Sequence, residues 1–215
     1  RAFRYCQLDT GHALAALIFA ARLNDWHLNL LGGVADNQIE RLLGFDRTPW
    51  HPNEEEAAEL MCWVSTQPID NATARDVASE HLGQFADKPF CGNPSPLSPK
   101  AVAWPIINQA ASASEKGPTQ EIEQPLADHR RIFAESEITA ASVIRRRRSA
   151  VRFDPNRSID VHTLEEILGR TIACRHMPPF NGATVLQQVE AVVFVHRVRG
   201  LSPGIYLLKR QKGAI

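Results

Sequence analysis

The spacing of hydrophobic residues along the chain predicts an alternation of helices and strands. Residues 13–23 are apolar on almost every side, which predicts a helix that is buried rather than amphipathic. Asp9 or Thr10 supplies the side-chain oxygen expected at the start of that helix. After a Gly-Gly turn, residues 36–44 predict a short capped helix. The side chains expected to point inward from it are Ile39, Leu42 and Leu43. Residues 60–64 then predict a strand.

The last third of the chain shows the same alternation. Residues 160–169 predict a helix, because Asp160 is a good N-cap and Gly169 is suited to a left-handed end. Its apolar face consists of Leu164, Ile167 and Leu168. Residues 188–198 are rich in β-branched side chains and predict a buried strand, which the Gly/Pro turn at 199–204 connects to a second strand at 205–210. Helices mixed with short strands and a hairpin indicate an α+β sandwich.

Between these parts lies a segment of different composition. Residues 67–134 are rich in Ser, Ala and Gln, and seven prolines between 89 and 125 argue against a long helix before Ile122. The apolar residues of 89–110 predict an extended strap rather than a free linker, with 112–125 as the most mobile part. A helix over 126–144 is expected to follow.

That helix leads into an unusual cluster of arginines. Residues 145–148 and 152 are arginines around a single serine, Ser149, and Phe153 follows. Guanidinium groups beside a hydroxyl suit a phosphate and a polyol chain. The alternatives are a solvated basic cluster or a nucleic-acid patch. Because Lys plus Arg and Asp plus Glu number 24 each, no global field draws in nucleic acid, and we expect no nucleic-acid partner.

Composition narrows the remaining classes. The chain contains no apolar stretch long enough for a membrane span, and no signal peptide is recognised, so we expect a cytoplasmic protein without a membrane partner. The four cysteines are far apart and the histidines lack metal-ligand spacing, which favours structural thiols and no metal site.

The arginine cluster and the helix after it resemble the opening of a nitroreductase-family domain. The shared features are Arg-Arg-Ser, a Phe, a turn and a Leu-Glu-Glu-Ile-Leu helix. In that family the matching residues hold the phosphate and ribityl chain of FMN, which implies this role for Arg147, Arg148 and Ser149. The family often has a basic residue two places after the serine. Here Val151 occupies that place and the arginine is displaced to Arg152, which the resemblance makes a further FMN candidate.

Two other segments resemble the SagB-type subgroup of this family. Residues 194–208 match its Val-x-Gly-Leu-x-Pro-Gly-x-Tyr hairpin, and residues 8–13 match a Leu-Asp-x-Gly-His-Ala segment of its C-terminal half. In the family the helix after that segment packs in the subunit interface. It often carries a Gln-Asn pair there, where this chain has Ala15 and Ala16.

The order of these matches implies a tandem protein. Residues 1–66 resemble the C-terminal part of one nitroreductase-like α-β-α domain and 135–215 the N-terminal part of a second, with 67–134 as the strap between them. We therefore expect the chain to be an internal fragment. Its two halves would pair as an intramolecular pseudo-dimer, or with a second copy as a homodimer.

The resemblance implies an FMN-dependent oxidoreductase that transfers hydride through the flavin. SagB-type relatives oxidise azoline rings in modified peptides, so a modified peptide or a small molecule is the expected substrate, and a nicotinamide is a candidate electron donor. No catalytic residue is identified. The alternative is a degenerate, non-catalytic nitroreductase-like scaffold or peptide-binding module, which Ala15, Ala16 and Val151 favour.

Overall fold

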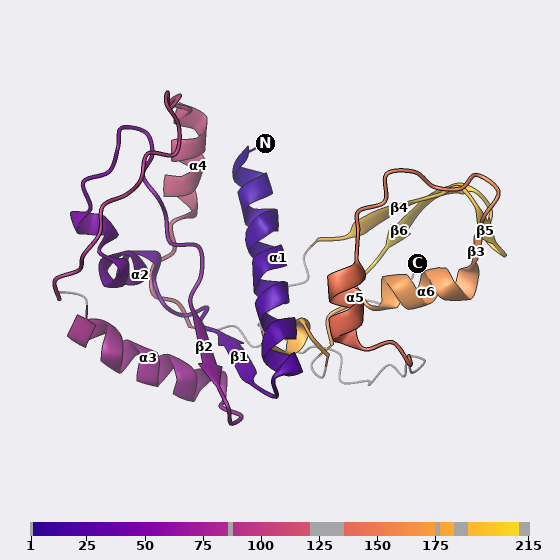
Figure 1. The fold of residues 1–215 in the computed structure, drawn as a ribbon, viewed down its shortest axis with the longest axis horizontal. Helices are drawn as coiled ribbons and strands as arrows, with labels where there is room; N and C mark the ends of the chain where they lie inside the picture. The colour runs from indigo at the N-terminus through magenta and orange to yellow at the C-terminus, as the bar shows by residue number, and fades with distance from the viewer. Residues whose placement is uncertain (1, 86–87, 121–135, 175–176, 183–188, 211–215) are drawn as a thin grey trace. The chain divides into compact units, whose positions relative to one another are not determined.

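The computed structural model describes residues 2–85, 88–120, 136–174, 177–182 and 189–210. The chain divides into two compact units, each treated below by itself. Unit 1 comprises residues 1–123 with 182–184, and unit 2 comprises 124–181 with 185–215. Both contain helices and small sheets (Figure 1), so the expected α+β class is confirmed at that level. None of the helices in the described ranges is both long and apolar enough to cross a membrane.

Unit 1 is built around a pair of antiparallel strands. Its regular elements are α1 (Ala2–Leu23), β1 (His27–Leu30), α2 (Asp36–Leu43), the 3-10 turn η1 (Phe45–Arg47), β2 (Cys62–Ser65), α3 (Asn71–Phe85) and α4 (Pro105–Ser114). The strands pair with Leu28 opposite Val64 and Leu30 opposite Cys62. The strand predicted at 60–64 is therefore confirmed, shifted by two residues at its start.

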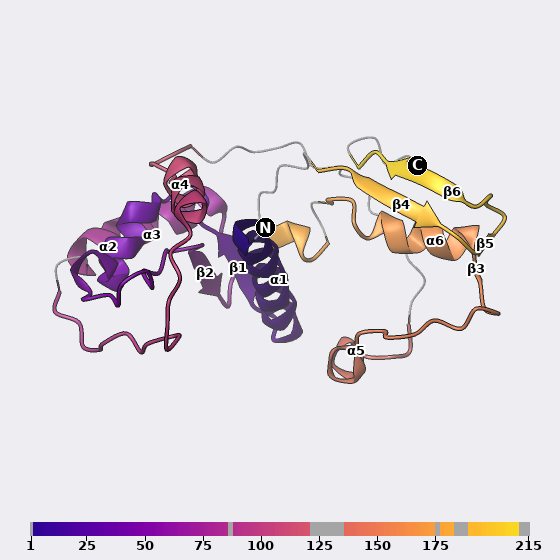
Figure 2. The same ribbon diagram turned by 90° about the horizontal axis from the view of Figure 1, so that it is seen from above.

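Helices cover both faces of this strand pair, as Figures 1 and 2 show. On one face Leu28 packs with Ile18 and Ala21 of α1. A second cluster gathers α2 and α3 against the other face. Its buried members are Leu31, Val34, Ile39, Ala74, Ala78 and Leu82, with Trp63 of β2 packed against them. The period-2 alternation of strand side chains places Leu28 and Trp63 in different clusters.

Helix α1 starts earlier than predicted and is less buried than predicted. It begins at Ala2, so Asp9 and Thr10 lie inside it, and the Thr10 hydroxyl donates to the carbonyl of Cys6 (3.0 Å). Of its residues only Ile18 and Ala21 are buried, because one side alone faces the strands. The exposed apolar side chains are Tyr5, Leu8, Leu17, Phe19 and Leu23. The prediction that this helix is buried is therefore wrong for unit 1 taken by itself.

Helix α2 confirms its predicted range and end. It ends at Gly44, which adopts the left-handed conformation (φ 73°) that favours glycine. Ile39 is buried and Leu42 half-buried as expected. Leu43 is 47% exposed, so its predicted inward position is wrong.

The proline-containing segment holds two helices. Helix α3 fills residues 71–85, before the first strap proline, and the carboxylate of Asp70 accepts from the backbone N–H of Thr73 at its start (2.9 Å). Helix α4 has Pro105 at its first position, where the missing N–H costs no helical hydrogen bond. The expectation that no long helix precedes Ile122 is therefore wrong. The predicted extended strap is found from 88 to 104, and it changes to helix at 105.

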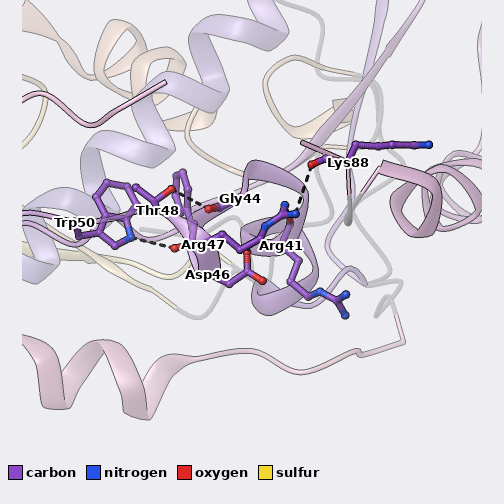
Figure 3. Close-up of polar contacts among 8 residues, drawn as sticks. Arg41, Gly44, Asp46, Arg47, Thr48, Trp50 and Lys88 are labelled. Atoms are coloured by element: carbon purple, nitrogen blue, oxygen red, sulfur yellow. Dashed lines mark hydrogen bonds and ion pairs between the residues drawn. The ribbon is translucent and has the colours of Figure 1, made fainter. Parts of the chain in front are cut away.

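The strap is fixed to unit 1 near the end of α2 (Figure 3). The Arg47 guanidinium donates to the carbonyls of Arg41 (3.2 Å) and Lys88 (3.4 Å), and it lies 5.3 Å from the centre of the Phe90 ring. The Phe90 ring in turn lies against Gly44. Arg47, which lies in η1, thus contacts both the end of α2 and the start of the strap.

Two further groups hold the strap along its length. The carboxylate of Glu54 accepts from the backbone N–H groups of Leu97 and Ser98, each at 3.0 Å. The His51 ring lies 3.2 Å from the carbonyl of Pro94. A carboxylate that accepts two backbone N–H bonds fixes the direction of the chain at that point. The strap therefore follows a defined path although it lacks the hydrogen-bond ladder of a β-strand.

After α4 the chain returns to the other end of α2. The Asp36 carboxylate accepts from the Lys116 backbone N–H (2.8 Å), and the Asp36 N–H donates to the Lys116 carbonyl (3.0 Å). The Lys116 ammonium donates to the carbonyl of Val34, and the Thr119 N–H donates to that of Gly33 (3.2 Å). Residues 88–119 therefore contact α2 at both its ends.

Unit 2 contains a smaller set of elements. They are α5 (Ala140–Arg146), β3 (Ile159–Asp160), α6 (Val161–Gly169), η2 (Phe180–Gly182, whose last residue belongs to unit 1), β4 (Ala191–Val195), β5 (Val198–Arg199) and β6 (Gly204–Leu208). Strands β4 and β6 form the predicted antiparallel hairpin, with Val193 opposite Tyr206. Strands β3 and β5 pair in parallel. In Figures 1 and 2, α6 lies beside the hairpin.

Four predictions for unit 2 need correction. The helix predicted over 126–144 lies outside the described residues up to 135, is not helical at 136–139, and begins at 140 after the cap Thr139. Gly169 is the last residue of α6, but Arg170 after it is right-handed, so no left-handed end forms. The strand predicted to be buried, at 188–198, has one exposed face, since Val192 is 56% and Phe194 64% exposed. Ile167 of α6 is also 52% exposed, so it is not part of a buried face.

We predict that Gly44→Ala destabilises the protein in a way that depends on Phe90. A Cβ at Gly44 would lie closer than 3.0 Å to the Phe90 ring, and the left-handed backbone adds roughly 1–2 kcal/mol for a non-glycine residue. The free energies of unfolding in urea of the single and double variants measure the contributions of the Phe90 clash and of the left-handed backbone. We expect Gly44→Ala to cost clearly more in the wild-type background than in Phe90→Ala, and equal costs would contradict the Phe90 contact.

Candidate functional site

The arginine cluster lies at the end of α5 and in the irregular chain that follows. Thr139 caps the start of α5 by accepting from the Ser142 N–H (3.3 Å), and Arg147 closes its end by donating its N–H to the Val143 carbonyl (2.9 Å). Arg145 and Arg146 therefore stand on the last helical turn, whereas Ser149 and Arg152 stand on irregular backbone. All residues from 143 to 159 are exposed.

Arg148 is the one predicted site residue with side-chain hydrogen bonds in the described part of the chain. Its Nη1 donates to the carbonyls of Arg147 (2.8 Å) and Arg145 (3.2 Å). A cation at the C-terminal end of a helix compensates the free carbonyl groups there. Arg148 thus has a structural role in α5, and the remaining N–H groups of its guanidinium are left for a ligand.

The structure does not gather the four predicted residues into an enclosed pocket. Arg147, Arg148 and Ser149 are consecutive on one exposed segment, and Arg152 follows three residues later on the same segment. Within the described residues, no carboxylate forms an ion pair with Arg147, Arg148 or Arg152, and no group hydrogen-bonds the Ser149 hydroxyl. The chemistry of this donor set fits a phosphate group, because several unneutralised guanidinium groups stand beside a free hydroxyl.

Two more arginines, absent from the sequence prediction, approach the same stretch of chain. Arg197 donates to the carbonyl of Pro155 (3.1 Å), and Arg199 donates to the Ser158 hydroxyl (3.2 Å). The parallel pairing of β3 with β5 brings them there, with Asp160 opposite Arg199. The signal in the sequence is the His-Arg-Val-Arg stretch directly before the hairpin turn, but its register against residues 155–160 requires the structure.

The turn and cap after the arginine cluster are as predicted. The Asp154 carboxylate accepts from the Asn156 N–H (2.9 Å) and lies 3.7 Å from the Arg157 guanidinium. Asp160 caps α6 by accepting from the Thr163 N–H (2.8 Å). That backbone hydrogen bond is the main reason why the pKa of Asp160 is lowered, and the Thr163 hydroxyl and the Arg199 guanidinium lower it further.

The formal net charge of zero is the sum of two units whose net charges are equal and opposite. Unit 2 has 15 Lys and Arg against 8 Asp and Glu, a net charge of +7. Unit 1 has 9 against 16, a net charge of −7. The argument from neutrality therefore does not hold for unit 2, whose own charge favours anionic ligands.

Cysteine chemistry contributes little to this site. The four cysteines, all within the described ranges, are thiols rather than disulfides, and Cys174, which belongs to unit 2, is buried. In unit 1, burial raises the pKa of the Cys62 thiol. A raised thiol pKa lowers the thiolate fraction at neutral pH, so Cys62 is poorly suited to nucleophilic attack.

Comparison with known proteins gives no relative for this chain. No family model matches the sequence, no curated protein is significantly similar to it, and no solved structure is significantly similar to the fold.

Replacing Asp160 by Asn and by Ala is expected to separate the stabilisation due to its charge from that due to its capping hydrogen bond. A lowered folded-state pKa means that the ionised carboxylate stabilises the fold above its ordinary pKa of 3.8, and that this stabilisation is lost as the pH falls through the folded-state pKa. We expect the Tm at pH 7 to decrease from wild type to Asp160→Asn and further to Asp160→Ala. The difference in Tm between the wild type and Asp160→Asn should therefore be smaller at pH 3 than at pH 7, and a difference that stays constant over this range would contradict the assignment.

Proposed function

We propose that the protein is an FMN-dependent oxidoreductase of the nitroreductase type, related to the SagB subgroup, in which unit 2 supplies the phosphate end of the flavin site. Arg147 and Arg148 would hold the FMN phosphate and Ser149 the ribityl chain, with Arg152 as a further partner. FMN when bound supplies hydride transfer. The substrate we propose is a modified peptide or a small molecule.

The observation that carries this proposal is the unneutralised donor set directly before a correctly capped helix. Phosphate binding needs fixed positive donors that are not already paired, and the described carboxylates leave Arg147 and Arg152 without an ion pair. The turn at Asp154, the cap at Asp160 and the hairpin of β4 and β6 occur in the order on which the resemblance rests. The net charge of unit 2 also favours a phosphorylated cofactor.

The exposed apolar side of α1 supports pairing with a second nitroreductase-like half. Leu8 is 61% and Phe19 42% exposed, and their spacing of 11 residues places them on the same side of α1. Large apolar side chains exposed on one helix face are typical of an interface. We propose that this side contacts either the second half within the full protein or another copy.

A second candidate is a non-catalytic scaffold or peptide-binding module with the same fold. Ala15 and Ala16 stand where the related helix often carries amides, and Ala15 is partly buried in α1 and has no hydrogen-bonding side chain to offer a flavin. An alanine in this place keeps the packing of the helix but supplies no donor or acceptor.

Flavin retention in paired arginine variants tests the oxidoreductase proposal. Arg147→Ala with Arg148→Ala should weaken FMN binding at least tenfold, since each charge-assisted hydrogen bond contributes about 1.5–3 kcal/mol. Arg145→Ala with Arg146→Ala removes the same charge from the neighbouring helical turn and serves as the matched control. Released FMN is measured by absorbance and its affinity by fluorescence titration.

The outcomes separate the two candidates. A specific loss in the first pair supports the proposed phosphate site. An equal loss in both pairs indicates a general charge effect and contradicts the assignment to Arg147 and Arg148. A folded wild-type protein that neither retains nor takes up FMN refutes the oxidoreductase proposal and leaves the scaffold.

A further inference from the structure

The segment around Ser149 presents a hydroxyl directly after four guanidinium groups on exposed, irregular chain. Residues 143–159 are exposed throughout, and the chain from 147 to 158 belongs to no helix or strand. We propose that Ser149 is a phosphorylation site for a protein kinase that selects basic substrates, and that its phosphate regulates FMN binding. The regulatory half of this inference rests on the proposed function, and the modification itself does not.

Kinase recognition requires an accessible chain and a charge pattern rather than a folded pocket. A kinase that selects basic substrates offers an acidic groove, and arginines before the serine supply the complementary charge. Arg145 and Arg146 are exposed on the last turn of α5, and no carboxylate in the described ranges pairs with them. Their charges are therefore available to a partner.

The neighbouring serines of unit 2 lack this combination. Ser142 lies within α5 and is half-buried, and a helical backbone does not fit an extended substrate groove. Ser158 is exposed, but a single arginine precedes it and its hydroxyl accepts from Arg199 (3.2 Å). Ser149 alone of these three joins a free hydroxyl to a run of arginines.

The chemical step is a phosphoryl transfer from ATP. The Ser149 Oγ forms a bond to the γ-phosphorus as the bond from that phosphorus to the bridging oxygen breaks, and ADP leaves. The hydroxyl proton passes to a base on the kinase. No electron transfer accompanies the step, and the kinase with its Mg²⁺ supplies the remaining groups.

The product places a second phosphate among the guanidinium groups proposed to bind FMN. A phosphoserine carries about −1.5 to −2 charges at neutral pH and pairs readily with nearby arginines. Arg147, Arg148 and Arg152 lie within three residues of Ser149 along the chain. They would be neutralised by the phosphoserine, and the cofactor phosphate would meet a like charge.

The first measurement is the site and stoichiometry of phosphorylation. The full chain is incubated with ATP, Mg²⁺ and the catalytic subunit of a cAMP-dependent protein kinase as the probe, and the sites are mapped by mass spectrometry. We expect one phosphate at Ser149, lost in Ser149→Ala and kept in the control Ser158→Ala. Arg145→Ala with Arg146→Ala should slow the reaction at least tenfold. No incorporation, or incorporation that persists in Ser149→Ala, overturns the proposed site.

The second measurement compares the phosphorylated and unmodified chains on two probes. Phosphorylation should lower the salt concentration that elutes the chain from immobilised heparin, because the arginines are then neutralised, and it should weaken FMN binding at least tenfold. Unchanged FMN affinity at full phosphorylation overturns the regulatory role. If the unmodified chain binds no FMN, the proposed function fails, while the mass and the heparin elution still decide the modification.

Discussion

Burial of both faces of the β1–β2 pair is the constraint on which unit 1 depends. A two-stranded sheet is marginal in water unless its apolar face packs against something else. Here Leu28 packs on α1, and the opposite face meets α2 and α3. The alternation of side chains along each strand decides which helix receives which residue, so the order of layers follows from two short strands. In unit 2 the β4–β6 hairpin meets this requirement on one face, with Val195 and Leu208 buried and Phe194 exposed.

The strap shows how a segment with linker-like composition acquires a fixed path. Its prolines and small polar residues supply no hydrophobic stripe, and its order comes from groups on the rest of unit 1. The Glu54 carboxylate and the Arg47 guanidinium hydrogen-bond backbone atoms of the strap, and the absence of a side chain at Gly44 leaves room for the Phe90 ring. The strap therefore behaves as part of the unit 1 fold, and the longer stretch 88–119 contacts α2 at both its ends.

Residues with strong local signals were predicted well from the sequence. Asp160 and Gly44 mark helix ends because capping geometry depends on the residues themselves, and the β4–β6 hairpin follows from its Gly/Pro turn. The start of α1 was missed because Asp9 and Thr10 are good caps that helical context overrode. The exposed faces of α1 and β4 were missed because apolar composition shows only that a side chain favours burial. Whether another element covers that side chain depends on the tertiary structure. For the candidate site, the sequence identified the arginine segment, but the approach of Arg197 and Arg199 depends on the pairing of β3 with β5, whose partners are 39 residues apart in the sequence.

The opposite charges of the two units have a consequence for the protein in solution. At neutral pH the molecule has no net charge to keep copies apart, whereas each copy presents one acidic and one basic part. At about 0.01 M ionic strength the Debye length is roughly 30 Å, so the basic part of one molecule attracts the acidic part of the next. At about 0.15 M it shrinks to roughly 8 Å and the attraction is largely screened. Such a protein dissolves better as salt is added, and its colloidal behaviour is that of a zwitterion.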